Sequence, residues 1–218
     1  MLRDALLATV APMIRKLVAS VDCRDHIHLM NRRIRIPWLL RALHGEESTP
    51  AELFVTYAVA LITAAIIVVR AAARPAAVTW WEITIVALLG ADIAAGAVAT
   101  FTTGTDRYYA ARPRLRTVFI LLHALHPLVL FFIIGGPVEV WAAVPGYAIV
   151  SALVVNGLTP RLQQVVAPAL AALGVVICFS WLVIAPPALW FGPLFLVKLV
   201  LGFAVRRSDL TAAPGTES

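Results

Sequence analysis

Charged side chains are scarce in this sequence. Only 14% of its 218 residues are Asp, Glu, Lys or Arg, whereas about a quarter are charged in an ordinary soluble domain. Hydrophobic residues make up 61% of the chain, and its mean hydropathy is +0.89. This composition excludes a soluble globular domain of this size. It predicts a polytopic membrane protein built as one domain.

Cysteine and acidic residues are also few. Of the two cysteines, Cys23 lies in a basic segment and Cys178 in an apolar one, so no disulfide is expected. Eighteen basic residues outnumber twelve acidic ones. Arginines on the cytoplasmic side of a membrane explain this excess more simply than nucleic acid does, so no nucleic-acid partner is predicted.

Familiar catalytic motifs are missing as well. The chain has no phosphate-binding P-loop, no glycine-rich dinucleotide fingerprint and no H-E-x-x-H zinc motif. It resembles no family by its motifs. The sequence therefore leaves any cofactor unknown.

The first 50 residues are polar and basic and contain no membrane span. Residues 2–21 carry apolar side chains at helical spacing, which predicts an amphipathic helix lying on the membrane surface. A cleaved signal peptide is disfavoured, because no uninterrupted apolar core with a small-residue cleavage site follows. The apolar positions are Leu2, Leu6, Val10, Ile14, Leu17 and Val21.

Six apolar segments follow this region. Each is close to the roughly 20 residues that a helix needs to cross a bilayer, and all are too long and too unalternating for barrel strands. The sequence thus predicts an all-α fold, with a six-helix transmembrane domain over 51–206 and a short tail over 207–218. The segments are 52–69, 78–101, 117–135, 138–156, 164–185 and 188–205.

Basic residues are distributed unevenly around these segments. Fifteen lie on the side that holds both termini, Arg70 and Arg74 lie on the other, and Lys198 falls inside the last segment. The positive-inside rule then places both termini in the cytoplasm and the chain in the plasma (inner) membrane.

Ionisable residues inside the spans are the main candidates for a functional site, because charge at membrane depth is costly. Asp92 shares one face of the second span with Gly96 and Asp106, and Arg116, His123 and His126 share one face of the third. At about 1.5 Å per residue, Asp92 and His126 both lie some 15–18 Å deep. We expect Asp92 within hydrogen-bond or single-water reach of His126 or His123, in an internal cavity, and Asp106 facing Arg116 at the cytoplasmic mouth. Gly96 would permit a close approach.

Pro127 adds to this pattern. A proline cannot donate to the carbonyl four residues earlier, which is that of His123. We expect this carbonyl to be free beside the histidine pair, at a depth where water is scarce.

Three interpretations of the Asp92, His123 and His126 group follow. It is an acid/base site, a metal site with these three residues as ligands, or a structural bridge between helices. The first predicts a membrane enzyme that acts on a lipid or isoprenoid, for example a proton-initiated isoprenoid cyclase. The alternatives are a proton- or metal-ion-coupled transporter, or a subunit of a membrane complex. A homo-oligomer is compatible with both the enzyme and the transporter interpretation.

Further residues are predicted to bind the charged end of a substrate. They are Asp106, Tyr109, Arg112, Arg116 and Lys198. Interfacial tyrosines and arginines are also typical of ordinary membrane topology. Lys198 is interpreted as a lysine that extends toward the interface, or else one that pairs with Asp92 or binds an anion.

Overall fold

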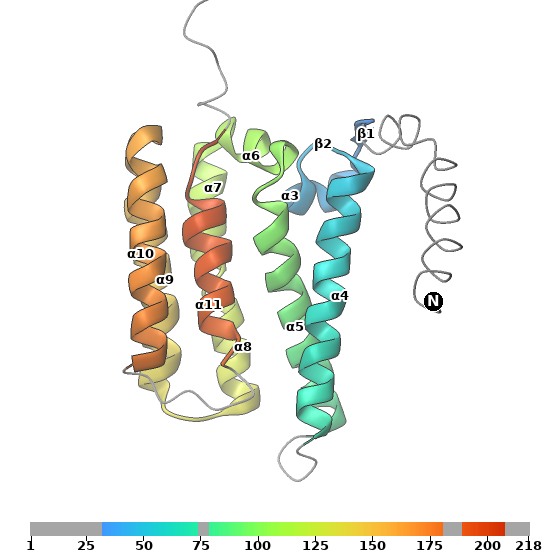
Figure 1. Cartoon of the computed structure of the whole chain (residues 1–218), viewed down its shortest axis with the longest axis vertical. Helices are drawn as coiled ribbons and strands as arrows, with labels where there is room; N and C mark the ends of the chain where they lie inside the picture. The colour runs from blue at the N-terminus through green and yellow to red at the C-terminus, as the bar shows by residue number, and fades with distance from the viewer. Residues whose placement is uncertain (1–31, 74–78, 181–188, 208–218) are drawn as a thin grey trace, which may run out of the picture.

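The computed structural model describes residues 32–73, 79–180 and 189–207. The predicted surface helix over 2–21, Cys23 and the tail beyond residue 207 lie outside these ranges. Within them the chain is mostly helical (Figure 1). The expected all-helical character is thus confirmed for this part, apart from one two-stranded pairing of four residues.

Five helices in the described ranges are long and apolar enough to cross a membrane. They are α4 (Pro50–Ala72), α5 (Trp80–Ala99), the pair α7 (Pro113–Leu122) and α8 (Leu125–Ile134) taken together, α9 (Val138–Asn156) and α10 (Pro160–Ser180). They stand side by side and alternate in direction (Figure 1). The protein is therefore a multi-pass helical membrane protein in its general character.

The last apolar segment is shorter than the other five. It runs as α11 (Phe191–Leu196) and continues without a break as a π-helix over Val197–Phe203. Its described helical length is below that of a full span, so the count of six spans stays a prediction.

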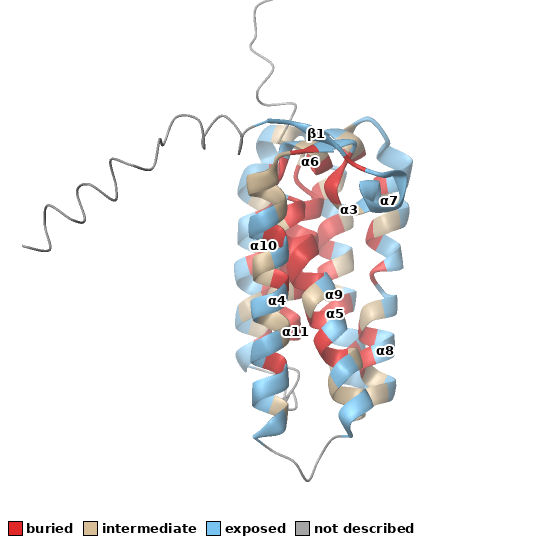
Figure 2. Cartoon of the chain, turned by 90° about the vertical axis from the view of Figure 1, so that its right-hand side faces the viewer, coloured by how far each residue is buried: buried red, intermediate tan, exposed pale blue. Residues whose placement is uncertain are grey.

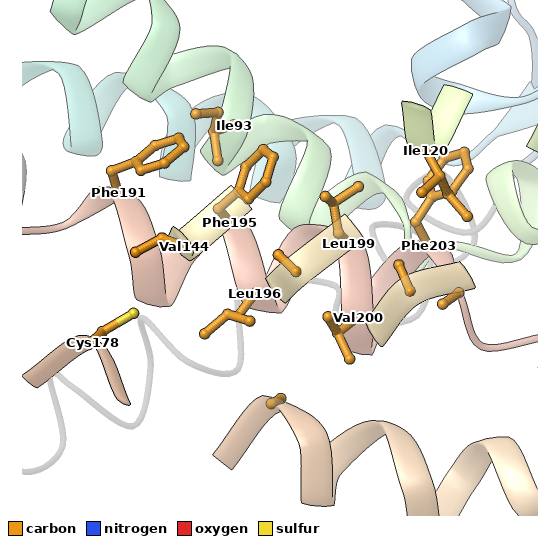
Figure 3. Packing of buried hydrophobic residues seen from close by; sticks show 14 of the residues in the cluster. Ile93, Ile120, Val144, Cys178, Phe191, Phe195, Leu196, Leu199, Val200 and Phe203 are labelled. Carbon is orange, nitrogen blue, oxygen red and sulfur yellow. The ribbon is translucent and has the colours of Figure 1, made fainter. Parts of the chain in front are cut away.

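This short helix is nevertheless the centre of the bundle. It packs against α5, α9 and α10, and successive turns of it are buried by residues from several neighbours (Figure 3). Phe195, Leu199 and Val200 have no exposed surface, and Ile93 of α5 and Ile120 of α7 pack beside them. The helix is therefore enclosed by protein over most of its length, including the turn that carries Lys198.

The exposed faces of the bundle, pale blue in Figure 2, carry many large apolar side chains. Leu61 of α4 is 71% exposed and Phe132 of α8 is 76% exposed. Exposed large apolar side chains along several helices are unfavourable in water but suit contact with lipid tails.

A small cap closes one end of the bundle. Strand β1 (Ile34–Arg35) pairs antiparallel with β2 (Glu47–Ser48), and between them lie a 3-10 turn, η1 (Trp38–Leu40), and α3 (Arg41–His44). This cap sits on α6 (Thr103–Ala110), the short helix between α5 and α7. The part of the basic N-terminal segment over residues 32–49 is thus folded onto the transmembrane helices.

Two glycines let the cap and α6 touch through their backbones. Gly45 has a φ of +74°, which few residues other than glycine adopt. A Cβ on Gly104 would lie 1.9 Å from the Glu47 carbonyl oxygen, far inside any tolerable contact.

We predict that Gly104→Ala destabilises the protein by about 1–3 kcal/mol, because the new methyl group forces the cap away from α6. The measurement is the unfolding temperature in detergent. Gly146→Ala is the matched control, since Gly146 is also helical and has open space where its Cβ would be. Equal effects of the two substitutions would contradict the close contact.

His44 gives the cap a pH dependence. The imidazole is fully buried, and its Nε2 lies 2.9 Å from the Tyr57 hydroxyl of α4. Burial lowers the pKa of His44 below its ordinary 6.5, and nearby Glu52 offsets only part of that effect.

Because the folded pKa is the lower one, the unfolded chain binds this proton more readily. The stability contribution of neutral His44 is therefore complete above about pH 6.5 and is lost as the pH falls below it. We predict a smaller drop in unfolding temperature between pH 7.5 and 5.5 for His44→Gln than for the unaltered protein. An identical drop in both would show that other groups cause it.

Candidate functional site

One carboxylate oxygen joins three helices in the middle of the bundle. Asp92 Oδ2, on α5, lies 2.8 Å from His126 Nε2 on α8 and 3.0 Å from Lys198 Nζ on the π-helix. The hydrogen bond between Asp92 and His126 is the one that their matched depth predicts. Lys198 completes a group of three that we call the Asp92 triad: Asp92, His126 and Lys198.

Lys198 is buried within the protein, with its side chain only 5% exposed. Its interpretation as a lysine extending toward the interface is therefore wrong, and the alternative of a pair with Asp92 is confirmed. The side chain crosses over Gly96, where a Cβ would lie 2.3 Å from Lys198 Cε. Gly96, one helical turn from Asp92, thus makes room for a lysine rather than for a helix backbone or a ligand.

The π-helical stretch positions this lysine. In it the amide of Ala204 donates to the carbonyl of Leu199, five residues earlier, at 3.0 Å. Such wide turns are rare, and they occur frequently at functional sites. No residue pattern in the sequence predicts a π-helical turn, so its position does not follow from the sequence alone.

Pro127 acts on the third span in another way than expected. The helix is interrupted at His123 and Ala124, which separates α7 from α8. The His123 carbonyl is not free, because it accepts a hydrogen bond from the His126 amide at 3.2 Å. The backbone here forms hydrogen bonds between residues three apart, as in a 3-10 helix. The His123 carbonyl thereby gains a hydrogen bond that Pro127, which has no N–H, cannot donate.

His123 lies beside the triad without a hydrogen bond to Asp92. Its Nδ1 is 2.6 Å from the Phe119 carbonyl oxygen, and its ring stacks on that of His126 with centroids 5.2 Å apart. The ring is 2% exposed, and Nε2 has no hydrogen-bond partner in the described part of the chain. The contact with a carbonyl assigns the proton to Nδ1.

The metal interpretation gains no geometric support. Over residues 32–73, 79–180 and 189–207, no three His, Cys, Asp or Glu side chains lie close enough together to hold an ion. A catalytic or structural metal usually has three or four protein ligands, and Lys198 occupies the position beside Asp92 that an ion would need.

The site opens on the side of the bundle. The Asp92 side chain is 52% exposed, whereas those of His126 and Lys198 are 18% and 5% exposed. The expected internal cavity is therefore wrong. Leu88, one turn from Asp92, and Leu125, next to His126, are both more than half exposed. Asp92 Oδ1 accepts no hydrogen bond from any described residue, whereas Oδ2 accepts two.

The residues predicted to bind a charged substrate end lie nearer the cap. Asp106 and Arg116 form an ion pair of 3.2 Å, and both side chains are almost fully buried. The expectation that Asp106 faces Arg116 is thus confirmed. Asp106 Oδ2 also accepts from the amide of Arg207. The Tyr109 hydroxyl donates to the Ala42 carbonyl. These contacts hold the cap, α6 and α7 together and favour a structural role for all three predicted residues.

The shared face from Asp92 to Asp106 is not one continuous helix. α5 ends at Ala99 and α6 begins at Thr103, so Asp106 belongs to a separate helix. Arg112 points away from the core, where its guanidinium lies 2.8 Å from Glu46 and over the Tyr108 ring.

No protein-family model, curated protein or solved structure matches this chain. Its function is therefore argued from the Asp92 triad itself.

We predict strong energetic coupling between Asp92 and Lys198. Asp92→Asn leaves a buried ammonium without its counter-charge and should cost about 2–4 kcal/mol. Lys198→Met should cost less, because methionine fills the same space and the half-exposed Asp92 keeps His126. The double variant should be more stable than Asp92→Asn alone. Unfolding in detergent measures all three, and additive effects would contradict the coupling.

Proposed function

We propose that this protein is a small integral-membrane enzyme that moves a proton on a lipid or isoprenoid substrate, with Asp92 as the reacting group. One observation carries the proposal. Oδ2 of Asp92 is held by two buried donors, while the Asp92 side chain is half exposed on the side of the bundle and Oδ1 accepts no hydrogen bond from the described residues. A substrate dissolved in the bilayer reaches such a site sideways, without crossing water.

The roles within the triad follow from which atoms are accessible. His126 uses Nε2 on Asp92, and its Nδ1 is buried without a partner among the described residues. The ammonium of Lys198 is buried as well. His126 and Lys198 are therefore positioning residues, and only Asp92 can touch a substrate. Donors fixed on one oxygen orient the other for proton transfer.

Asp92 suits the role of a base better than that of an acid. An ammonium at 3.0 Å and an imidazole N–H at 2.8 Å are charge-assisted donors that match a carboxylate. A cyclase that starts by protonating an isoprenoid needs the carboxyl form instead. The proposal thus favours proton abstraction from the substrate over proton-initiated cyclisation within the same substrate class.

A proton- or ion-coupled transporter remains the second candidate, and one observation disfavours it. Transport needs a polar route to both faces of the membrane. Thr100 and Asp106 are buried polar residues nearer the cap, but the opposite half of the central helix carries Phe191, whose ring packs against Trp141 of α9. A one-sided route fits an enzyme better.

The proposal includes an orientation. Arginines crowd the cap end of the described chain, whereas Arg70 lies at the other end of α4. By the positive-inside rule the cap faces the cytoplasm, both termini lie there, and the host membrane is the plasma (inner) membrane. The short central helix is then the sixth span, completed by neighbouring residues.

The proposed function is tested by comparing lipid extracts from cells with and without the protein. A new or depleted lipid species should appear with the unaltered protein. It should be absent with the double variant Asp92→Asn/Lys198→Met, which lacks the base but leaves no unpaired charge. Glu139→Gln, an exposed acid at the end of the bundle away from the cap, is the matched control and should behave as the unaltered protein.

Mass spectrometry of the extracts supplies the measurement, with expression of each variant checked in detergent-solubilised membranes. An unchanged lipid profile in every case would count against the enzyme. Proton-driven uptake into vesicles that disappears in the double variant would favour the transporter.

A further inference from the structure

A second polar feature lies at the cap, well away from the Asp92 triad. Where β2 meets α6, the surface is hollowed into an open pocket of about 290 Å³. Its charged and aromatic lining comes from Arg33, Glu46, Glu47, Arg107, Tyr108 and Arg112. These residues come from segments far apart in the sequence that meet at one end of the molecule (Figure 1).

Arg112 is fixed in this pocket before any ligand arrives. Its guanidinium lies 2.8 Å from Glu46 Oε1, donates to the Tyr108 carbonyl and stacks 4.2 Å from the Tyr108 ring centroid. A planar guanidinium held in this manner keeps its fork of donors at a fixed angle, which suits a tetrahedral oxyanion.

The charge balance leaves one cation in excess. Glu46 pairs with Arg112, and Glu47 pairs more loosely with Arg33 at 3.8 Å. Arg107 lines the same pocket, and its side chain makes no hydrogen bond or ion pair with another residue within the described ranges. Arg107 is therefore the group with the most to gain from an anionic ligand.

The pocket lies where a membrane interface would be. Trp38 and Leu39, in the same cap, are 75% and 69% exposed. An exposed tryptophan beside arginines at the end of a transmembrane bundle is typical of the lipid headgroup region. The chemistry that three arginines and a tyrosine recognise best there is a phosphoryl group.

We propose that this pocket binds a phosphoryl group, with Arg107 and Arg112 as its main contacts. The predicted substrate-binding arginines are thereby revised, since Arg116 is buried against Asp106 and Arg107 takes its place. The source of the group is a phosphorylated lipid of the surrounding leaflet or a soluble phosphate. This site is independent of the proposed reaction at Asp92.

The test measures ligand binding to the full-length protein in neutral detergent micelles, without any activity readout. The probes are dioleoyl phosphatidic acid, inorganic phosphate and dioleoylglycerol, which has the same acyl chains and no phosphate. Phosphatidic acid should bind with saturation, and Arg107→Gln should weaken its binding at least five-fold. Arg114→Gln is the matched control, because Arg114 is an exposed arginine at the same end that does not line the pocket. It should change binding less than two-fold.

Glu47→Gln gives a test in the opposite direction. Removing a carboxylate that competes for Arg33 should tighten binding at least two-fold, which a merely structural role of these residues would not do. Saturable binding of inorganic phosphate with the same dependence on Arg107 would also support the pocket and would name a soluble phosphate as its source.

Two results would overturn the proposal. Equal weakening by Arg107→Gln and Arg114→Gln would mean diffuse attraction to a basic surface. Dioleoylglycerol binding as tightly as phosphatidic acid would mean that acyl chains, not the phosphoryl group, are recognised. The double variant Asp92→Asn/Lys198→Met should bind as the unaltered protein, so failure here is distinguishable from failure of the enzyme proposal.

Discussion

The burial of one ammonium group constrains the whole bundle. Lys198 lies on the most enclosed helix of the protein, where an unpaired charge would cost several kcal/mol. Its counter-charge has to come from a neighbouring helix, and Asp92 supplies it at 3.0 Å. The pairing fixes α5 against the π-helix, and Gly96 has to be small because the lysine side chain crosses it. His126 then adds α8 to the same carboxylate.

This arrangement is asymmetric in a way that a purely structural bridge does not require. A structural ion pair is usually either exposed, where solvent weakens its attraction, or buried, where desolvation opposes it. Here the two donors are buried and the acceptor is half exposed. The Asp92 carboxylate lies half exposed on the side of the bundle, while the two groups that orient it are buried. That difference in exposure is the physical ground for the proposal that Asp92 reacts with a substrate.

Much of the fold could be predicted from the sequence, because apolar length decides which segments can span a bilayer. The same depth argument brought Asp92 and His126 together, since two helices entering from one end advance equally per residue. The depth argument also allowed a hydrogen bond between Asp92 and His123, which the described residues do not make. The helix is interrupted ahead of Pro127, between the two histidines, and the backbone around them is tightened. A helical wheel assumes an unbroken helix, so it does not include this change in backbone geometry.

Lys198 and the pocket arginines were harder to foresee for a different reason. Whether a lysine in an apolar segment extends outward or pairs inward depends on which helix occupies the centre, and all the apolar segments look alike in composition. The π-helical turn that carries Lys198 has no sequence signature. Likewise Arg33 and Arg107 are 74 residues apart, and they share a pocket because the cap packs closely on α6, where Gly45 meets Gly104.

The two glycine contacts show how backbone spacing sets the chemistry at both ends of this molecule. At the cap, the absence of a side chain on Gly104 allows β2 and α6 to form the walls of one pocket. In the bundle, the absence of one on Gly96 allows a flexible cation to reach a carboxylate on the same helix. At Gly104 a Cβ would meet the Glu47 carbonyl and push β2 away from α6, and at Gly96 it would meet Lys198 Cε and displace the ammonium from Asp92. The positions of the charged groups thus depend on Gly96 and Gly104, the two residues that leave room for them.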